Sequence, residues 1–206
     1  MTSIAATATC QLGEPARSDP PFASGFARVA LTDRVHCARP LPEQVLRIAG
    51  RIDAIVVRER DLDDDAYERL ARAVAAACDE AGVALIVHGR PAVARRMGLN
   101  AVHLPLPQLV EQGRPAGIAW VGTNVHEPDE VELAQRSGAD YLMASPIFKP
   151  SCKPLAAARG LEFLERVLAC ARLPVLALGG IDDAAERAVR STGAAGACRM
   201  SGYMLL

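Results

Sequence analysis

Eight short apolar runs, and the spacing between them, restrict the fold of this chain more than any other feature. Most of the runs are almost continuously aliphatic, as expected of parallel strands covered on both faces. Segments with helical periodicity separate them, so the pattern predicts a parallel sheet. About eight repeats favour a closed (β/α)8 TIM barrel over an open doubly wound sheet, which is the alternative. The predicted strands cover residues 27–31, 54–57, 84–87, 101–104, 118–121, 141–144, 175–178 and 196–200.

Predicted helices fill the intervals between these strands. Proline in a first turn and glycine after a last turn mark several helix ends, as Pro128 and Gly138 do for the segment 128–137. Few residues follow the eighth strand, so the last helix is expected to be short or missing. The predicted helices cover residues 42–48, 64–81, 91–97, 128–137, 161–171 and 183–191, with 106–112 as a weaker candidate.

The composition fits a single folded domain, which we assign to residues 26–206. Of the 206 residues, 50% are hydrophobic and 23% are charged, which is enough for one substantial core. Residues 1–25 lack periodicity, and Asp19-Pro20-Pro21 opposes regular structure, so this stretch is expected to be a disordered or loosely packed tail. The formal net charge of −1 gives no attraction for nucleic acid or a membrane surface.

The cysteines and the hydropathy pattern bear on the compartment. Six cysteines show neither a CxxC pair nor zinc-ligand spacing, and a chain of this length needs no disulfides. No apolar run reaches the length of a membrane span, and the N-terminus lacks the pattern of a signal peptide. We therefore expect a cytoplasmic protein.

The loops that follow the strands of such a barrel share one face, where sites lie in this fold. In this chain those loops hold more Arg, Lys and Gly than carboxylates, which favours a phosphorylated small molecule as ligand. Gly179-Gly180 and Met200-Ser201 follow the seventh and eighth strands, where backbone N–H groups and a hydroxyl can approach an anion closely. A tight turn that needs glycine is the alternative interpretation.

A series of motifs carries a family resemblance. They occur in order as VALTDR (29–34), VVRERD (56–61), AVHLP (101–105), VGTNVHEPDEVELAQRSGADY (121–141), SPIFKPSCKPLAAARGLEFL (145–164), LPVLALGGI (173–181) and GACRMSG (196–202). Together they resemble the thiamine phosphate synthase/TenI family over nearly everything after the tail. The resemblance implies a (β/α)8 barrel and a homo-oligomer, commonly a dimer.

The synthase branch of that family joins a pyrimidine diphosphate to a thiazole phosphate with magnesium. Its pattern implies Asn-Asp after the third strand, where this chain has His88-Gly89, and an acidic ligand after the fourth, where 103–108 holds no carboxylate. Its Thr-x-Thr-Lys pattern reads PSCK (150–153) here, and its serine after the fifth strand is Asn124. Because magnesium needs hard oxygen ligands, these departures argue against the synthase reaction.

The TenI-like branch is more similar. Its Cys-Lys followed by Ala-Arg-Gly-Leu-Glu resembles CK (152–153) and ARGLE (158–162). That branch is associated with thiazole tautomerase activity, which aromatises a carboxythiazole phosphate by moving a proton without a metal or other cofactor. A histidine after the fifth strand is the acid/base there, which implies a catalytic role for His126. An imidazole, whose ordinary pKa is about 6.5, can both take and return a proton near neutral pH. A capping or packing role is the alternative.

The same resemblance assigns residues to the substrate. A cluster that faces the substrate in the family corresponds to Arg58, Glu59 and Arg60, for which an ordinary surface charge cluster is the alternative. His103 is expected to be a hydrogen-bonded core histidine. The predicted substrate-binding residues are Arg58, Glu59, Arg60, His88, Asn124, Ser151, Cys152 and Lys153, and the predicted phosphate-binding residues are Gly179, Gly180, Met200 and Ser201.

These observations lead to one main hypothesis and two alternatives. The main hypothesis is a TenI-like tautomerase that binds a phosphorylated thiazole-type small molecule. The first alternative is a thiamine phosphate synthase. The second is a barrel that binds a phosphate ligand without catalysis and acts as a sensor.

Overall fold

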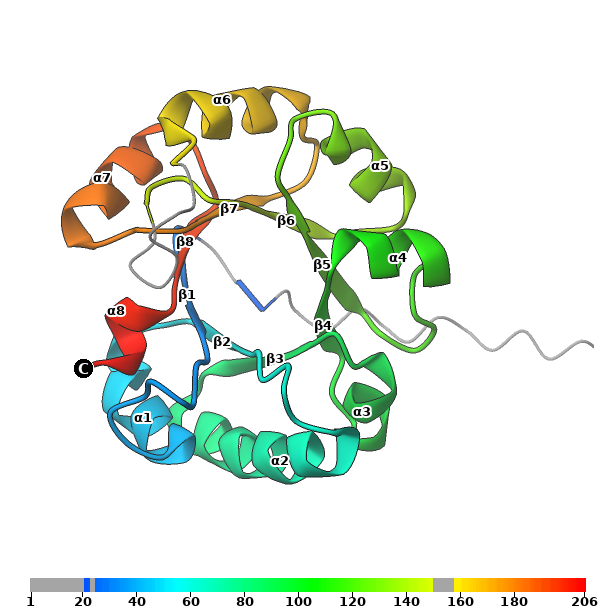
Figure 1. The fold of residues 1–206 in the computed structure, drawn as a ribbon, viewed down its shortest axis with the longest axis vertical. Helices are drawn as coiled ribbons and strands as arrows, with labels where there is room; N and C mark the ends of the chain where they lie inside the picture. Colours follow the sequence, from blue (N-terminus) through cyan, green and yellow to red (C-terminus); the bar gives the residue numbers. More distant parts are fainter. Residues whose placement is uncertain (1–20, 23–24, 150–157) are drawn as a thin grey trace, which may run out of the picture.

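Eight parallel strands close into one barrel in the computed structural model, which describes residues 21–22, 25–149 and 158–206. Each strand pairs with the next along the chain, and β8 pairs with β1. Figure 1 shows the closed ring with the helices outside it. The closed (β/α)8 barrel is therefore confirmed over the open sheet. The strands are β1 (Ala27–Leu31), β2 (Ala54–Val57), β3 (Ala84–His88), β4 (Ala101–Leu104), β5 (Trp120–Val125), β6 (Tyr141–Ala144), β7 (Val175–Leu178) and β8 (Gly196–Arg199).

The helices lie in the predicted intervals, and capping residues mark where some of them begin. Asp63 accepts a hydrogen bond from Ala66 N at 2.7 Å at the start of α2, and Asp182 does the same for Ala185 N at 2.8 Å at the start of α7. The last helix is a single turn, as expected. The helices are α1 (Leu41–Ile48), η1 (Ala49–Arg51), α2 (Asp64–Ala81), α3 (Pro91–Arg96), α4 (Leu106–Gln112), α5 (Glu130–Arg136), α6 (Gly160–Cys170), α7 (Asp183–Ser191) and α8 (Ser201–Met204).

The fifth strand differs most from its prediction. The sequence predicts a strand at 118–121, whereas β5 begins at Trp120 and continues to Val125. Its second half contains Gly122, Thr123 and Asn124, and glycine and asparagine are poor strand formers. Pairing overrides that preference, because this half is hydrogen-bonded between β4 and β6.

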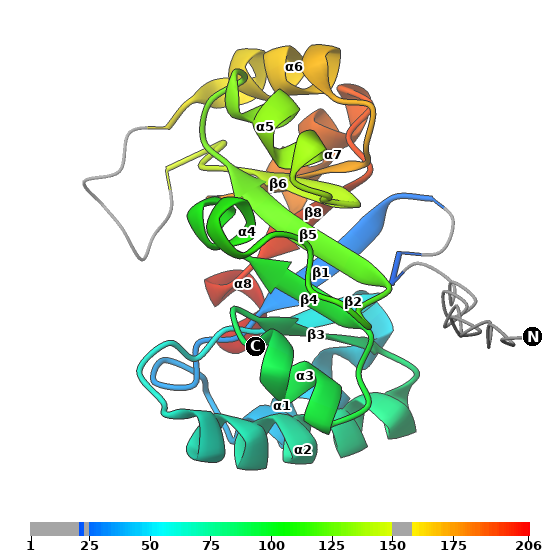
Figure 2. The same cartoon turned by 90° about the vertical axis from the view of Figure 1, so that its right-hand side faces the viewer.

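Alternation along the strands sends one set of side chains into the barrel and the other toward the helices. Figure 2 shows the strands crossing the molecule at a tilt between helices on opposite sides. At the end of the barrel where the strands begin, the Phe22 ring packs edge-on against Tyr141 with centroids 4.8 Å apart. Phe22 thus belongs to the packed domain, although it falls within the predicted tail. The buried apolar residues of the interior are Ala27, Val29, Leu31, Ala54, Val56, Ile86, Ala101, Tyr141, Met143, Leu176 and Cys198.

None of the helices in the described part of the chain combines the length and the apolar character that a membrane span requires.

Candidate functional site

A cavity of about 1580 Å³ opens at the end of the barrel where the strands finish. Side chains from all eight strand ends, or from the loops that follow them, line it. This is the face where the sequence predicts the site. Ser151, Cys152 and Lys153 lie outside the described residues, so their placement stays a prediction. The predicted site residues that line the cavity are Arg58, Arg60, His88, Asn124, His126, Gly179, Gly180, Met200 and Ser201.

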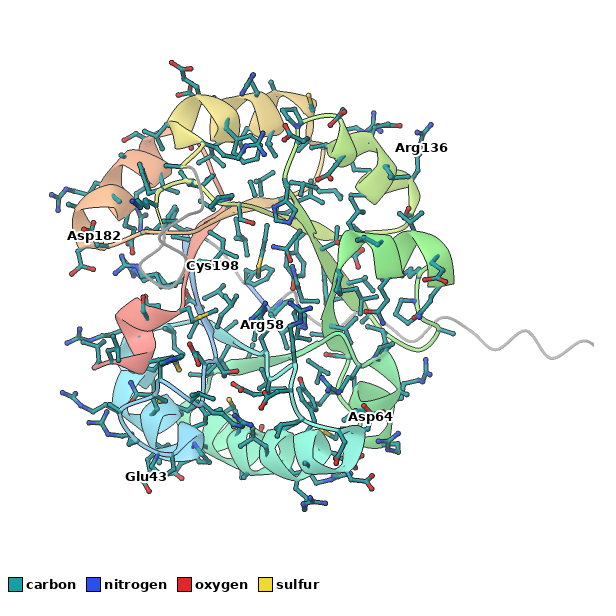
Figure 3. All side chains as sticks on the ribbon, viewed as in Figure 1. Glu43, Arg58, Asp64, Arg136, Asp182 and Cys198 are labelled. Atoms are coloured by element: carbon teal, nitrogen blue, oxygen red, sulfur yellow. The ribbon has the colours of Figure 1, made fainter. Side chains whose placement is uncertain are left out.

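The side chains of the three charged residues that follow β2 point in alternate directions. Arg58 and Arg60 continue the inward series of the strand and line the cavity. Figure 3 shows Arg58 inside the ring, whereas Glu43 and Arg136 lie on helices at the periphery. Glu59 points the other way, is only 3% exposed, and accepts a hydrogen bond from Arg34 N at 3.1 Å. The structure therefore places Glu59 in a contact between loops, away from the lining of the cavity.

His126 lies at the rim of the cavity, just beyond the end of β5. Its Nδ1 is 2.8 Å from the carbonyl oxygen of Ser145 at the end of β6. A carbonyl oxygen can only accept, so Nδ1 carries the hydrogen and the neutral ring keeps a lone pair on Nε2. The backbone contact thereby selects the tautomer and orients the ring. His126 is held as a base whose accepting nitrogen is Nε2.

Arg159, at the start of α6, and Glu130, in α5, hold the loop that carries His126. The Arg159 guanidinium donates to the His126 carbonyl oxygen and pairs with Glu127 at 2.5 Å. Glu130 accepts from His126 N at 2.5 Å and from Glu127 N at 3.2 Å. The sequence does not predict the two contacts of Arg159, because they join segments more than thirty residues apart. Arg159 stands out only as part of the ARGLE motif.

A buried polar chain crosses the floor of the cavity. His103 is 2% exposed, with Nε2 at 2.8 Å from Asn124 Oδ1 and Nδ1 at 3.2 Å from Tyr141 Oη. The expectation of a hydrogen-bonded core histidine is therefore confirmed. His88 on β3 stacks on His103 with ring centroids 5.9 Å apart, and is 8% exposed. His88 and His103 both line the cavity.

Both buried histidines are held neutral. Burial lowers the pKa of His88 to about 3, and His103, Arg58, Arg60 and Arg90 add to that effect. Burial also lowers the pKa of His103 to about 4, against the hydrogen bond from its ring to Asn124. Two neutral rings thus lie beside a group of arginines, which is compatible with an anionic ligand above them.

We expect the neutral histidines to make folding sensitive to acid. In the unfolded chain a histidine binds a proton below about pH 6.5, whereas His88 in the folded protein does not until about pH 3. Stability from this difference is present above pH 6.5 and is lost as the pH falls toward 3. Each such group contributes up to about 1.4 kcal/mol per pH unit. Between pH 7 and pH 4.5, the urea midpoint of unfolding should fall less for His88→Asn than for the wild type. His36→Asn, at an exposed histidine, serves as the control, and equal losses in all three proteins would contradict the expectation.

Gly179 and Gly180 have a structural reason to be glycine. Their φ angles are +109° and +62°, and a Cβ on Gly180 would lie 2.6 Å from the carbonyl oxygen of Lys149. The close approach of the loop after β6 therefore accounts for the glycines without a ligand. Met200 and Ser201 complete this side of the cavity. Phosphate binding here stays a prediction.

The described donors around the cavity do not match the magnesium ligands that the resemblance implies for the synthase branch. Within the described residues, no three His, Cys, Asp or Glu side chains are grouped to hold a metal ion. Each carboxylate on the described lining already accepts hydrogen bonds from backbone N–H groups or from arginine. Magnesium requires hard oxygen ligands, and the described lining after β3 and β4 supplies no carboxylate. The carboxylates elsewhere on the described lining are Glu130, Asp182, Asp183 and Glu186.

Comparison with solved structures agrees with the barrel. Thiamine phosphate pyrophosphorylase from Pyrococcus furiosus superposes with a TM-score of 0.74 and 24% identity, over 85% of this chain and 86% of that one. At this identity the likeness supports the fold alone.

Comparison with other sequences identifies the family. A putative thiamine-phosphate synthase 2 of Aquifex aeolicus is 31% identical over 180 residues, which is 85% of this chain and 96% of that protein. A thiamine-phosphate synthase of Syntrophomonas wolfei is 29% identical, over 88% and 90% of the two chains. Both names are those of synthases and not of tautomerases. The family model for thiamine monophosphate synthase matches residues 29–203. The chain therefore belongs to the thiamine monophosphate synthase family, an enzyme family of thiamine biosynthesis.

Proposed function

We propose that this protein binds a thiazole phosphate in the cavity and that His126 moves a proton on it, so that the protein is a thiazole tautomerase. The observation that carries the proposal is the 2.8 Å contact between His126 Nδ1 and the Ser145 carbonyl oxygen. It leaves Nε2 as the accepting nitrogen at the rim of a cavity lined by cationic side chains. A proton shift within one substrate needs such a base and no redox partner.

The binding part of the proposal uses the charge of the lining. Arg58, Arg60 and Lys149 give the cavity positive charge that suits a phosphorylated ligand. We propose that the phosphate lies at the ends of β7 and β8, against the backbone of Gly179 and Gly180 and the residues Met200 and Ser201. Lys153, Ser151 and Cys152 would approach it from the loop after β6.

The chemical part of the proposal assigns two roles to His126. As a base, Nε2 takes a proton from the ring of the non-aromatic carboxythiazole phosphate; as an acid, the same nitrogen returns a proton at another atom of the substrate. The gain in aromaticity drives the shift. The Ser145 carbonyl stabilises the imidazolium between the two steps, because it accepts from Nδ1–H in both protonation states.

A second candidate is the synthase reaction, which the names of the relatives favour. It uses a thiazole phosphate too, so the same cavity would serve it. The described lining holds no carboxylate after β3 and β4, where the resemblance implies the magnesium ligands, and we therefore place the tautomerase first. The third possibility, a barrel that binds without catalysis, predicts ligand stabilisation and no turnover.

One assay separates these functions. The purified protein is given the non-aromatic carboxythiazole phosphate in EDTA and, separately, thiazole phosphate with the pyrimidine diphosphate in magnesium. We expect fast aromatisation in EDTA and no thiamine phosphate above background. Magnesium-dependent formation of thiamine phosphate, without aromatisation, would instead establish the synthase. Thermal stabilisation by the thiazole phosphate without either reaction would establish the binding protein.

A further inference from the structure

The hydrogen-bond chain from Tyr141 through His103 to Asn124 has one direction, and that direction can be derived. Tyr141 is fully inside the barrel, and burial raises the pKa of its hydroxyl well above the ordinary value, so the group keeps its proton. Within the described residues, the hydrogen-bond partner of this hydroxyl is His103 Nδ1, at 3.2 Å. A buried O–H that is left without an acceptor is costly, so Nδ1 must be the acceptor.

The rest of the chain follows from the neutral ring. His103 carries a single hydrogen, because its pKa is about 4. With Nδ1 accepting from Tyr141, that hydrogen lies on Nε2 and is donated to Asn124 Oδ1 at 2.8 Å. The carbonyl oxygen of the Asn124 amide is thereby committed to His103. The NH2 group is the half of the amide that His103 does not contact, and Asn124 lines the cavity.

We propose that this chain holds the Asn124 amide with its NH2 group directed into the cavity, so that Asn124 selects ligands with an oxygen acceptor at that end. Asn124 is then a specificity-determining residue, and His103 and Tyr141 are positioning residues behind it. Room for the arrangement comes from Gly122, two residues earlier on β5, since the Tyr141 ring occupies the space of its absent Cβ.

The place of Asn124 in the ring indicates which acceptor it meets. Figure 1 shows β5 across the ring from β8, where we place the phosphate. The end of a thiazole ligand remote from its phosphate would then lie toward β3, β4 and β5. On a carboxythiazole phosphate, the acceptor at that end is the carboxylate. This identification of the acceptor rests on the proposed function, whereas the orientation of the amide does not.

The orientation is tested by ¹⁵N NMR of the histidine rings, with the His103 signals assigned by their loss in His103→Gln. We expect His103 to be the Nε2–H tautomer in the wild type. Asn124→Asp keeps an oxygen acceptor for Nε2–H, so the tautomer should stay unchanged and the pKa of His103 should rise. If the amide were reversed, the wild type would show the Nδ1–H tautomer and Asn124→Asp would switch it. That result would overturn the proposal.

The acceptor is tested with two ligands that differ only in the carboxylate, the aromatic carboxythiazole phosphate and the thiazole phosphate. We expect Asn124→Asp to weaken binding of the carboxylated ligand by roughly tenfold or more and of the other by less than about threefold, since the loss of a hydrogen bond to a charged group is of this order. Asn100→Asp, the same change outside this cavity, should alter neither affinity. Equal weakening of both ligands by Asn124→Asp would overturn the assignment of the carboxylate. If the wild type binds neither ligand, the proposed function is wrong, and the NMR result alone decides the orientation.

Discussion

Replacing His126 with glutamine is expected to slow aromatisation of the carboxythiazole phosphate by about 10²- to 10⁴-fold. Glutamine can still donate a hydrogen bond to the Ser145 carbonyl oxygen, but it has no nitrogen that can take a proton. Binding should survive, because the positive charge of the cavity comes from other residues. The measurement is kcat for the variant beside the wild type in EDTA, together with the affinity for the aromatic product.

The matched control is His36→Gln, at an exposed histidine that pairs with Asp33 and does not line the cavity. It should leave kcat unchanged. A His126→Gln variant that keeps the wild-type rate would show that another group carries the proton. A variant that loses affinity and rate together would indicate that His126 acts in binding.

Replacing Gly122 with alanine is expected to cause the largest loss of stability. A Cβ there would lie 1.9 Å from Cζ of the Tyr141 ring, far inside any real contact. The ring cannot move aside easily, because Phe22 packs against it and His103 accepts a hydrogen bond from its hydroxyl. Overpacking of this kind costs typically about 1–3 kcal/mol and occasionally more. Urea unfolding followed by circular dichroism measures the loss.

Two further variants show whether the clash is the cause. Gly50→Ala adds a Cβ that meets nothing within 4 Å, so its midpoint should stay near that of the wild type. In a Tyr141→Leu background, Gly122→Ala should cost much less than it does alone, because the ring is gone. Equal costs of Gly122→Ala in the two backgrounds would contradict the role of the ring.

The strands could be predicted from the sequence wherever an apolar run coincides with the paired segment. Tyr141–Ala144 and Val175–Leu178 are examples, and both strands have the predicted bounds. β5 could not be predicted in this way, because Gly122 and Asn124 have low strand propensity and their roles, room for Tyr141 and a hydrogen bond with His103, are tertiary. The signal that could have found it is the alternation of Gly122, Asn124 and His126 on one face.

The site could be predicted in part, for a related reason. A strand period continued past β2 would have separated Arg58 and Arg60 from Glu59, which the structure turns toward Arg34. The contacts that orient His126 and Asn124 had no local signal, because Ser145 and His103 are brought to them by the pairing of β5 with β6 and β4. The roles of Ser151, Cys152 and Lys153 stay predictions.

The most direct test of the account is the rate at which the wild-type protein aromatises the carboxythiazole phosphate in EDTA. The reaction can be followed by NMR in D2O, where the aromatic product has its own signals and any proton exchanged with solvent appears as deuterium. The account predicts conversion far above the buffer rate without metal. Conversion at the buffer rate, in a protein that still binds the product, would contradict it.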